Sequence, residues 1–245
     1  DRIGGFVAEP IQASGGIIIP PKDYLYRMWK VCQQHDILFI ADEVVTAFGR
    51  IGHWFASMDE FGVQPDMITS AKGLTSGYLP LGALILSDRI WNTMAEGGQR
   101  WFTTGFTYSG HPVSCMAGLK NIEIMEREGM LANASKVGAY FNARLKTLES
   151  LPLVGNVRGR GLMLCVESVA NKQTKDLLPD AANESKRISD VAESLGLIVR
   201  PIGHLNVMSP PLIITEAQVD FVVETLGKAI TRVTDDLVRE GFKLA

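Results

Sequence analysis

Cysteine is scarce in this sequence, and long apolar runs are absent. The three cysteines, Cys32, Cys115 and Cys165, are odd in number and far apart, which predicts neither a disulfide framework nor a zinc site and fits a reducing compartment. The longest apolar stretches, such as Leu81–Leu86, have the length of a strand and not of a bilayer-spanning helix. Residues Asp1–Gly5 lack the basic-then-apolar pattern of a secretory signal. We therefore expect a cytoplasmic protein with no membrane segment.

An excess of charge of either sign is also missing. The 24 lysines and arginines nearly balance the 27 aspartates and glutamates, so bulk charge draws the chain neither to nucleic acid nor to anionic membranes. The 4 histidines show no metal-ligand spacing, and we assign them no metal. With 245 residues, 46% of them hydrophobic and 21% charged, the chain has ordinary globular composition. This predicts one large domain or two modest ones.

Short apolar strands alternate with amphipathic helices in the first half of the chain. Leu25, Met28, Trp29 and Cys32 have the i, i+3, i+4, i+7 spacing of one helix face. Apolar runs too short for a helix follow, and in such an alternation they are typical of buried parallel strands. The predicted strands are Gly5–Glu9, Ile37–Ala41, Met67–Ser70 and Leu81–Leu86, the last three expected to be buried and parallel.

The second half has the pattern of a smaller α+β domain. Pro112 is placed to begin a helix, and a further helix runs from about residue 131 to residue 148. Thr215 and Gln218 form a capping-box pattern before a long final amphipathic helix. We set the boundary after Arg127, giving domains of residues 1–127 and 128–245. Also predicted are a helix side formed by Cys115, Leu119, Ile122 and Met125, strands at Val157–Val166 and Leu197–Arg200, and a helix lined by Ile188, Val191, Ala192 and Leu195 and stopped by Gly196.

Two polar residues follow predicted strands and are candidates for chemistry. Asp42 comes directly after Ile37–Ala41, at the strand end where open parallel sheets bind ligands. Lys72 follows the next strand, and loss of hydration there favours the free-base amine that imine formation requires. Together they match what a pyridoxal phosphate site needs, a lysine for the imine and a carboxylate for the pyridine nitrogen. The alternatives are a helix cap or solvated loop for Asp42 and Glu43, and a surface loop lysine.

Two further segments could bind anions. The hydroxyl- and glycine-rich stretch Thr103–Pro112 runs into a helix start and offers donors to an anion, although an ordinary N-cap loop has the same composition. Arg200 could hold a carboxylate in bidentate fashion, the alternative being an exposed arginine at a strand end.

In order and spacing, several motifs resemble the class III aminotransferases, pyridoxal-phosphate enzymes of fold type I. Each motif is weak by itself, but the series extends over nearly the whole chain. The motifs are Glu9-Pro-Ile-Gln12, Ala41-Asp-Glu-Val44, Phe48-Gly-Arg-Ile-Gly52, Pro65-Asp66, Ala71-Lys-Gly-Leu74, Thr107-Tyr-Ser-Gly-His-Pro112, Arg158-Gly-Arg-Gly161 and Ser209-Pro-Pro-Leu212. The resemblance implies an α/β fold with a partial, mostly parallel large-domain sheet and a smaller α+β C-terminal domain.

The resemblance also implies roles for individual residues. Lys72 would form the internal aldimine with pyridoxal phosphate and shuttle a proton, while Asp42 would pair with the pyridine nitrogen and Val44 would pack on the ring. Thr107, with the backbone near Phe106, would reach the cofactor phosphate of the neighbouring subunit, so a homodimer with shared sites is implied. Arg200 would be the mobile arginine that binds a substrate carboxylate.

Two departures from the family pattern bear on the substrate. Members of the ornithine and 4-aminobutyrate type, which use 2-oxoglutarate, have glutamate where this chain has Ser14 and tend to have glutamine where it has Val45. The chain therefore resembles the ω-amine, β-alanine or taurine:pyruvate group, with an amine or ω-amino acid as donor and pyruvate as the expected acceptor. An aminomutase or a decarboxylating aminotransferase on the same scaffold remains an alternative.

The family's N-terminal part has no counterpart in this sequence. That part includes the Gly/Ser phosphate loop and the aromatic residue that stacks on the ring. We therefore expect the chain to be a portion of a longer enzyme. A non-catalytic fragment that serves as a dimerising or binding module is the alternative from outside enzymology.

Overall fold

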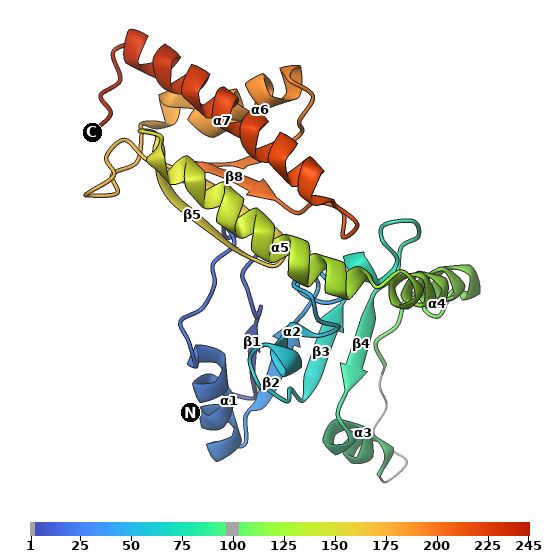
Figure 1. Cartoon of the computed structure of the whole chain (residues 1–245). Helices are drawn as coiled ribbons and strands as arrows, with labels where there is room; N and C mark the ends of the chain where they lie inside the picture. The colour runs from blue at the N-terminus through green and yellow to red at the C-terminus, as the bar shows by residue number, and fades with distance from the viewer. Residues whose placement is uncertain (1–2, 97–102) are drawn as a thin grey trace. The chain divides into compact units, whose positions relative to one another are not determined.

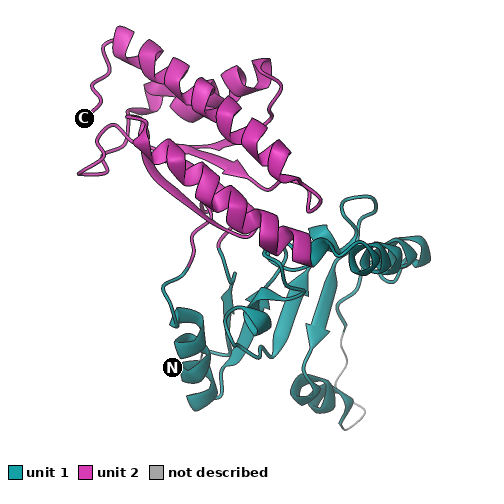
Figure 2. Ribbon diagram, in the orientation of Figure 1, with its two compact units in different colours: residues 1–11, 20–131 teal, residues 12–19, 132–245 magenta. Residues whose placement is uncertain are grey.

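The computed structural model describes residues 3–96 and 103–245, and the chain divides into two compact units. Unit 1 comprises residues 1–11 and 20–131, and unit 2 comprises residues 12–19 and 132–245 (Figure 2). The boundary expected after Arg127 lies close to the later division, but residues 12–19 group with unit 2 and not with the first domain. Local composition could not place this segment, since its tertiary contacts decide to which unit it belongs.

Unit 1 contains one four-stranded sheet in the order β1-β2-β3-β4, with helices in the connections (Figure 1). Strands β1, β2 and β3 are parallel, as the sequence predicted for the main part of the sheet. The elements are β1 (Gly5–Ala8), α1 (Tyr24–Gln34), β2 (Leu38–Asp42), α2 (Ala56–Asp59), β3 (Met67–Ser70), the 3-10 turn η1 (Lys72–Leu74), β4 (Ala83–Leu86), α3 (Asp88–Ala95) and α4 (Pro112–Arg127).

Strand β4 corrects the prediction that Leu81–Leu86 is a buried parallel strand. It pairs with β3 in the antiparallel sense, and most of its residues are exposed. Only the short turn η1 and a loop connect the two strands. A parallel crossover ordinarily uses a helix that spans the sheet, so this short connection favours an antiparallel return.

The core of unit 1 forms between α1 and the sheet. The expected apolar face of α1 contributes Leu25 and Cys32, which pack with Phe39 and Ala41 of β2 and with Ile68 of β3. Phe39 and Ala41 alternate with residues of intermediate exposure along β2. This core fixes β2 and β3 side by side and so determines where their carboxyl ends lie.

The inner face of α4 differs from the prediction. Leu119, expected in the apolar stripe, is 61% exposed, whereas Ser114, Gly118 and Met125 are buried. A Cβ at Gly118 would lie 2.9 Å from Leu81 Cδ2, so the small residue lets the Leu81 side chain pack closely against the helix. The predicted stripe is therefore correct at Met125, which is buried, and wrong at Leu119, because α4 also packs through the small residues Ser114 and Gly118.

Unit 2 is an α+β structure around an antiparallel sheet in the order β5-β6-β8-β7. Its core lies between this sheet and helices α5, α6 and α7. The elements are α5 (Met130–Lys146), which begins just before the division, the 3-10 turns η2 (Thr147–Ser150) and η3 (Asp180–Ala182), β5 (Val154–Arg160), β6 (Met163–Ser168), α6 (Glu184–Ser194), β7 (Arg200–Ile202), β8 (Leu205–Met208) and α7 (Glu216–Arg239).

Two strand predictions in unit 2 are corrected. Val157–Val166 is not one strand but a hairpin, because Gly161 adopts a φ of +55° in the two-residue turn between β5 and β6. Leu197–Arg200 is not a strand either, since the N–H of Leu197 donates to the carbonyl of Ala192 at the end of α6. Strand β7 therefore starts at Arg200 instead of ending there.

The capping box predicted for the final helix is confirmed. The N–H of Gln218 donates to Thr215 Oγ1 at 3.3 Å, and the N–H of Thr215 donates to Gln218 Oε1 at 2.9 Å.

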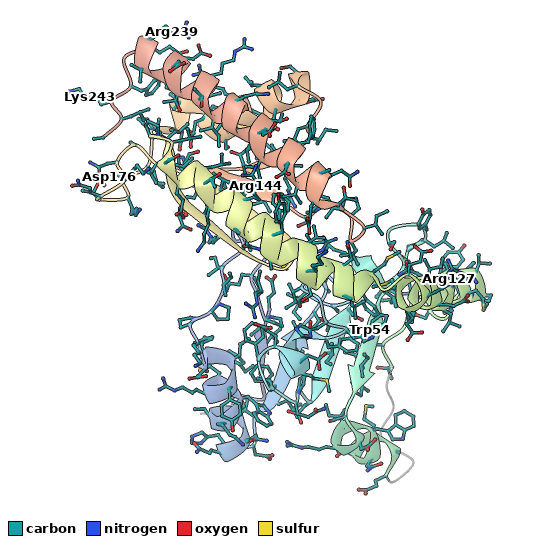
Figure 3. The ribbon with its side chains drawn as sticks, in the orientation of Figure 1. Trp54, Arg127, Arg144, Asp176, Arg239 and Lys243 are labelled. Carbon is teal, nitrogen blue, oxygen red and sulfur yellow. The ribbon has the colours of Figure 1, made fainter. Side chains whose placement is uncertain are left out.

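A side-chain hydrogen bond joins helices α5 and α7. Arg144 of α5, labelled in Figure 3, donates through Nε to Asp220 Oδ1 of α7 at 2.7 Å. This hydrogen bond holds the pKa of Asp220 below its usual range.

The three cysteines are free, and Cys165 is completely buried in β6. Burial raises the pKa of the Cys165 thiol to about 11, so it is protonated at neutral pH.

No helix in the described residues has both the length and the apolar character needed to cross a bilayer.

The close packing of α5 against the β5–β6 turn in unit 2 can be tested at Gly138 of α5. A Cβ there would lie 2.6 to 2.7 Å from backbone atoms of Gly161, which cannot move aside as a side chain could. We expect Gly138→Ala to lower the free energy of unfolding by about 3 kcal/mol, the upper end for overpacking. In the matched control Gly227→Ala, the new methyl meets only Leu148 Cδ2, at 3.2 Å, and the loss should be much smaller. Urea unfolding measures both, and equal losses would contradict the Gly138 contact.

Candidate functional site

The two residues singled out by the sequence, Asp42 and Lys72, come to one edge of the sheet in unit 1. Asp42 is the last residue of β2, and its register partner on the adjacent parallel strand β3 is Thr69. Lys72 follows Ser70, the end of β3, by two residues. Because carboxyl ends of parallel strands share an edge, an acid and an amine are presented there together.

The Asp42 carboxylate has one hydrogen bond and one unpartnered oxygen. The N–H of Val44 donates to Oδ1 at 3.1 Å, which fixes the orientation of the carboxylate. In the part of the chain that the structure describes, Oδ2 has no hydrogen-bond partner. The side chain is half-buried, so Oδ2 can accept a strong hydrogen bond from a bound cationic or N–H group.

The neighbouring carboxylate, Glu43, serves as a structural cap. Its side chain is completely buried and accepts hydrogen bonds from the Ala56 N–H at 2.9 Å and the Ser57 N–H at 2.6 Å, in the first turn of α2. The hydroxyls of Thr46 and Ser57 also donate to it. The helix-cap alternative considered for both acids therefore applies to Glu43 and not to Asp42.

Lys72 has an unusual backbone conformation for a lysine. Its φ is +38°, in the left-handed region that costs a side-chain-bearing residue about 1 to 2 kcal/mol. Its side chain is exposed in unit 1. The η1 turn and its contacts maintain this conformation, which places the lysine side chain directly after the sheet edge. Backbone strain of this kind is concentrated at functional sites.

Asn121 of α4 holds the turn that follows Lys72. Its Nδ2 donates to the carbonyl of Gly73 at 2.8 Å and to that of Leu74 at 3.1 Å, and its Oδ1 accepts from the hydroxyl of Ser76. Sequence reasoning missed this residue. The available signal was a polar side chain on the same helix face as Gly118 and Met125, the face that packs against the turn.

The loop after β2 also supports the lysine turn. A Cβ at Gly73 would lie 2.9 Å from Phe48 Cβ, so glycine is required for the turn to lie against this loop. Phe48 is itself buried and has a φ of +55°. Val44, at the start of the loop, is partly exposed next to Asp42. In this way the motifs around residues 42–52 and 71–74 pack together.

Phe106 and Thr107 lie in a separate turn before α4. Phe106 is 83% exposed, its N–H donates to Ser109 Oγ at 2.8 Å, and the N–H of Ser109 donates back to its carbonyl. Neither Phe106 nor Thr107 hydrogen-bonds to Asp42 or Lys72 within the described residues. The segment also provides the N-cap of α4, because His111 Nδ1 accepts from the Ser114 N–H.

Arg200 belongs to unit 2, where it is the first residue of β7. Its side chain is exposed, and in the described part of the chain its guanidinium has no ion pair or hydrogen bond. The Arg200 guanidinium is therefore available to a carboxylate ligand.

No cluster of three or more potential metal ligands (His, Cys, Asp or Glu) is found among the described residues.

The residues at the sheet edge of unit 1 fit pyridoxal phosphate. The cofactor needs an amine for its carbonyl group and a carboxylate for its ring nitrogen. Lys72 Nζ and the unpartnered Oδ2 of Asp42 are groups of these two kinds, and they follow or end adjacent strands. Val44, next to Asp42, offers an apolar surface for the ring.

Relatives with assigned activities align over almost the entire chain. A diaminobutyrate–2-oxoglutarate transaminase of Halomonas elongata is 41% identical, over 98% of this chain and 52% of its own length. A putrescine–pyruvate aminotransferase of Pseudomonas aeruginosa is 38% identical, over 94% of this chain and 50% of its own length. The chain therefore spans about half the length of the curated relatives it matches.

A solved structure and a family model agree with these relatives. The PLP-bound amine transaminase of an uncultivated Pseudomonas species is 43% identical and superimposes with a TM-score of 0.90, over 94% of this chain and 52% of its own. The model of the family described as Aminotransferase class-III matches residues 1–230. The chain belongs to the class III aminotransferases, a family of pyridoxal-phosphate-dependent enzymes with fold type I.

Proposed function

We propose that this chain is the lysine-bearing part of an enzyme that transfers an amino group from an amine or ω-amino acid to a keto acid, with pyruvate as the preferred acceptor. The observation that carries the proposal is that Lys72 and Asp42, whose carboxylate has an unpartnered oxygen, follow adjacent parallel strands and so come to one sheet edge. Family membership supports amino-group transfer, and the placement of Asp42 and Lys72 at one sheet edge supports the roles proposed for them.

In this proposal, Asp42 and Lys72 have different roles: Asp42 binds the ring nitrogen of the cofactor, and Lys72 holds the cofactor and moves a proton. Pyridoxal phosphate, when bound, supplies the reactive carbonyl and the ring that accepts electrons from the substrate carbon. Asp42 Oδ2 holds the proton on the ring nitrogen, while the Val44 N–H keeps the carboxylate in position. Lys72 Nζ would hold the cofactor through its carbonyl group and would move a proton at the substrate carbon that carries the amine.

The proposed site is completed by a second subunit. Thr107, with the backbone near Phe106, lies in an exposed turn, so its donors are available to a phosphate held by a neighbouring copy. Exposed apolar side chains lie in this turn and along α4, which favours a covered surface. They are Phe106, Tyr108, Val113, Met116 and Leu119. A homodimer with shared sites is part of the proposal.

Three residues support pyruvate as the preferred acceptor. Ser14 and Val45 stand where the 2-oxoglutarate-using type has glutamate and glutamine. Without that glutamate, Arg200 has no acidic partner within the described residues that would mask it from a monocarboxylate such as pyruvate. Overall similarity does not decide this point. One relative at 41% identity is named for 2-oxoglutarate and another at 38% for pyruvate.

The attachment point is tested by trapping. Incubation with pyridoxal phosphate followed by borohydride should leave a reduced cofactor adduct on Lys72, because reduction makes the link to Nζ permanent. Lys72→Ala should lose the adduct, and Lys22→Ala, a change at another exposed loop lysine, should keep it. Intact mass and peptide mapping measure both, and a stoichiometric specific adduct in Lys72→Ala would refute the assignment.

The role of Asn121 is tested by changing its donor into an acceptor. Asn121→Asp sets a carboxylate against the carbonyls of Gly73 and Leu74, and we expect a loss of about 2 kcal/mol in stability. It should also slow cofactor attachment at Lys72, on the order of ten-fold, as followed by absorbance. In the control Asn142→Asp, the amide likewise contacts two carbonyls, those of Gly138 and Gly161, but in unit 2. Equal slowing in both variants would contradict the role.

The acceptor is tested in a paired assay with one amine donor. We expect kcat/KM for pyruvate to exceed that for 2-oxoglutarate, on the order of ten-fold, because the second carboxylate of 2-oxoglutarate lacks a matched partner. Rates with both keto acids are measured at equal concentrations on the same enzyme preparation. A preference for 2-oxoglutarate would overturn the acceptor proposal and leave the role of Lys72 untouched.

A further inference from the structure

Helix α6 of unit 2 has a buried polar stripe. Glu184, Ser185 and Ser189 are only 1%, 2% and 8% exposed, and they lie beside Ile188 and Ala192, which are fully buried. Burying such groups without partners is costly, so the hydrogen bonds they form define their role. All three side chains bond to the β7–β8 hairpin, which carries Arg200, or to Val199 directly before it.

One of these bonds lies next to Arg200. Ser189 Oγ donates to the carbonyl of Val199 at 2.8 Å, and both residues are buried. Val199 directly precedes Arg200, so this hydrogen bond from Ser189 fixes the peptide group that joins the two residues. No other element of the described chain bonds to this carbonyl.

The other bonds hold the hairpin turn. The Ser185 hydroxyl donates to the carbonyl of Gly203, and His204 Nδ1 lies 2.6 Å from Glu184 Oε1. In return, Asn206 Nδ2 donates to the carbonyl of Ser185 at 2.9 Å. Helix α6 therefore holds the hairpin at the turn as well as at the start of β7.

Strand β7 needs this support because its own ladder is short. It has 3 residues, lies at the outer edge of the sheet and pairs only with β8. Its middle residue, Pro201, is opposite Asn206 at a non-hydrogen-bonded position, so only the pairs on either side of it contribute ladder hydrogen bonds to β8. Backbone pairing alone would leave the start of the strand weakly held.

We propose that Ser189, together with Glu184 and Ser185, acts as a set of positioning residues for the substrate carboxylate. The set, named here the α6 clamp, holds the backbone of Arg200 in place, so that its guanidinium changes position by side-chain rotation alone. This inference rests on the proposed function, in which Arg200 binds donors that carry a carboxylate. Donors without one do not use Arg200 and are indifferent to the clamp.

The test follows the donor half-reaction of the pyridoxal-phosphate-loaded protein, with no keto acid present. Loss of cofactor absorbance is measured against concentration for β-alanine, which has a carboxylate, and putrescine, which has none. For Ser189→Ala we expect the half-saturating concentration of β-alanine to rise about five-fold, the effect of one hydrogen bond. The value for putrescine and both limiting rates should stay unchanged. Ser189→Thr, which keeps the hydroxyl, should restore the wild-type value.

The matched control is Ser194→Ala. Ser194 lies on the same helix and also donates to a backbone carbonyl, that of Val191, but within α6 itself. This variant should behave as wild type with both donors. A rise of equal size for β-alanine and putrescine in Ser189→Ala, or no rise at all, would overturn the clamp.

The exchange rate of backbone amide hydrogens tests the α6 clamp independently of activity. Backbone amides of residues 199, 200, 202 and 203 should exchange faster in Ser189→Ala than in Ser194→Ala, and unchanged exchange would also overturn the proposal. Failure of the wild-type protein to react with either donor would instead refute the proposed function. The exchange result would then still decide whether α6 restrains the backbone.

Discussion

The parallel pairing of β2 with β3 is the constraint on which the candidate site depends. Ile40, Ala41 and Asp42 are in register with Met67, Ile68 and Thr69, and the side chains of Ala41 and Ile68 are buried in the core. A shift by one residue would move this apolar set to the other face of the sheet. The positions of Asp42 and Lys72 are therefore set by core packing and backbone hydrogen bonds, not by their attraction for each other.

Both candidate binding elements depend on polar side chains from a neighbouring helix. Asn121 of α4 bonds to the turn after Lys72, and Ser189 of α6 bonds to the residue before Arg200. In each case the helix bonds to backbone carbonyls and leaves the functional side chain free. A buried hydrogen bond of this kind stabilises one backbone position without restricting the rotamers of the adjacent residue. The arrangement combines a rigid support with a mobile reactive group.

Local patterns predicted much of the fold because the relevant signals are local. The apolar spacing of α1, the short apolar runs of β2 and β3 and the Thr215 capping box each depend on a few neighbouring residues. The order of Asp42 and Lys72 after their strands predicted that both lie at one edge of the sheet, and the structure confirms this placement.

The errors arose where long-range pairing or close packing decides. The antiparallel direction of β4, the hairpin within Val157–Val166 and the late start of β7 depend on partner strands or on α6. Asn121 was missed because its partners, the carbonyls of Gly73 and Leu74, lie far away in the sequence. Glu43 was given the same alternatives as Asp42, since only the fold brings α2 to one acid and not to the other.

Pro201 has a consequence for assembly as well as for local order. An exposed edge strand can recruit a strand of another molecule and so start aggregation, and proline is one of the residues that make such an edge a poor template. Strand β7 is the outer strand of its sheet, and Pro201 occupies its centre. Pro201 thus protects the outer edge of β7, next to the exposed Arg200, from unwanted β-sheet growth without removing a hydrogen bond to β8.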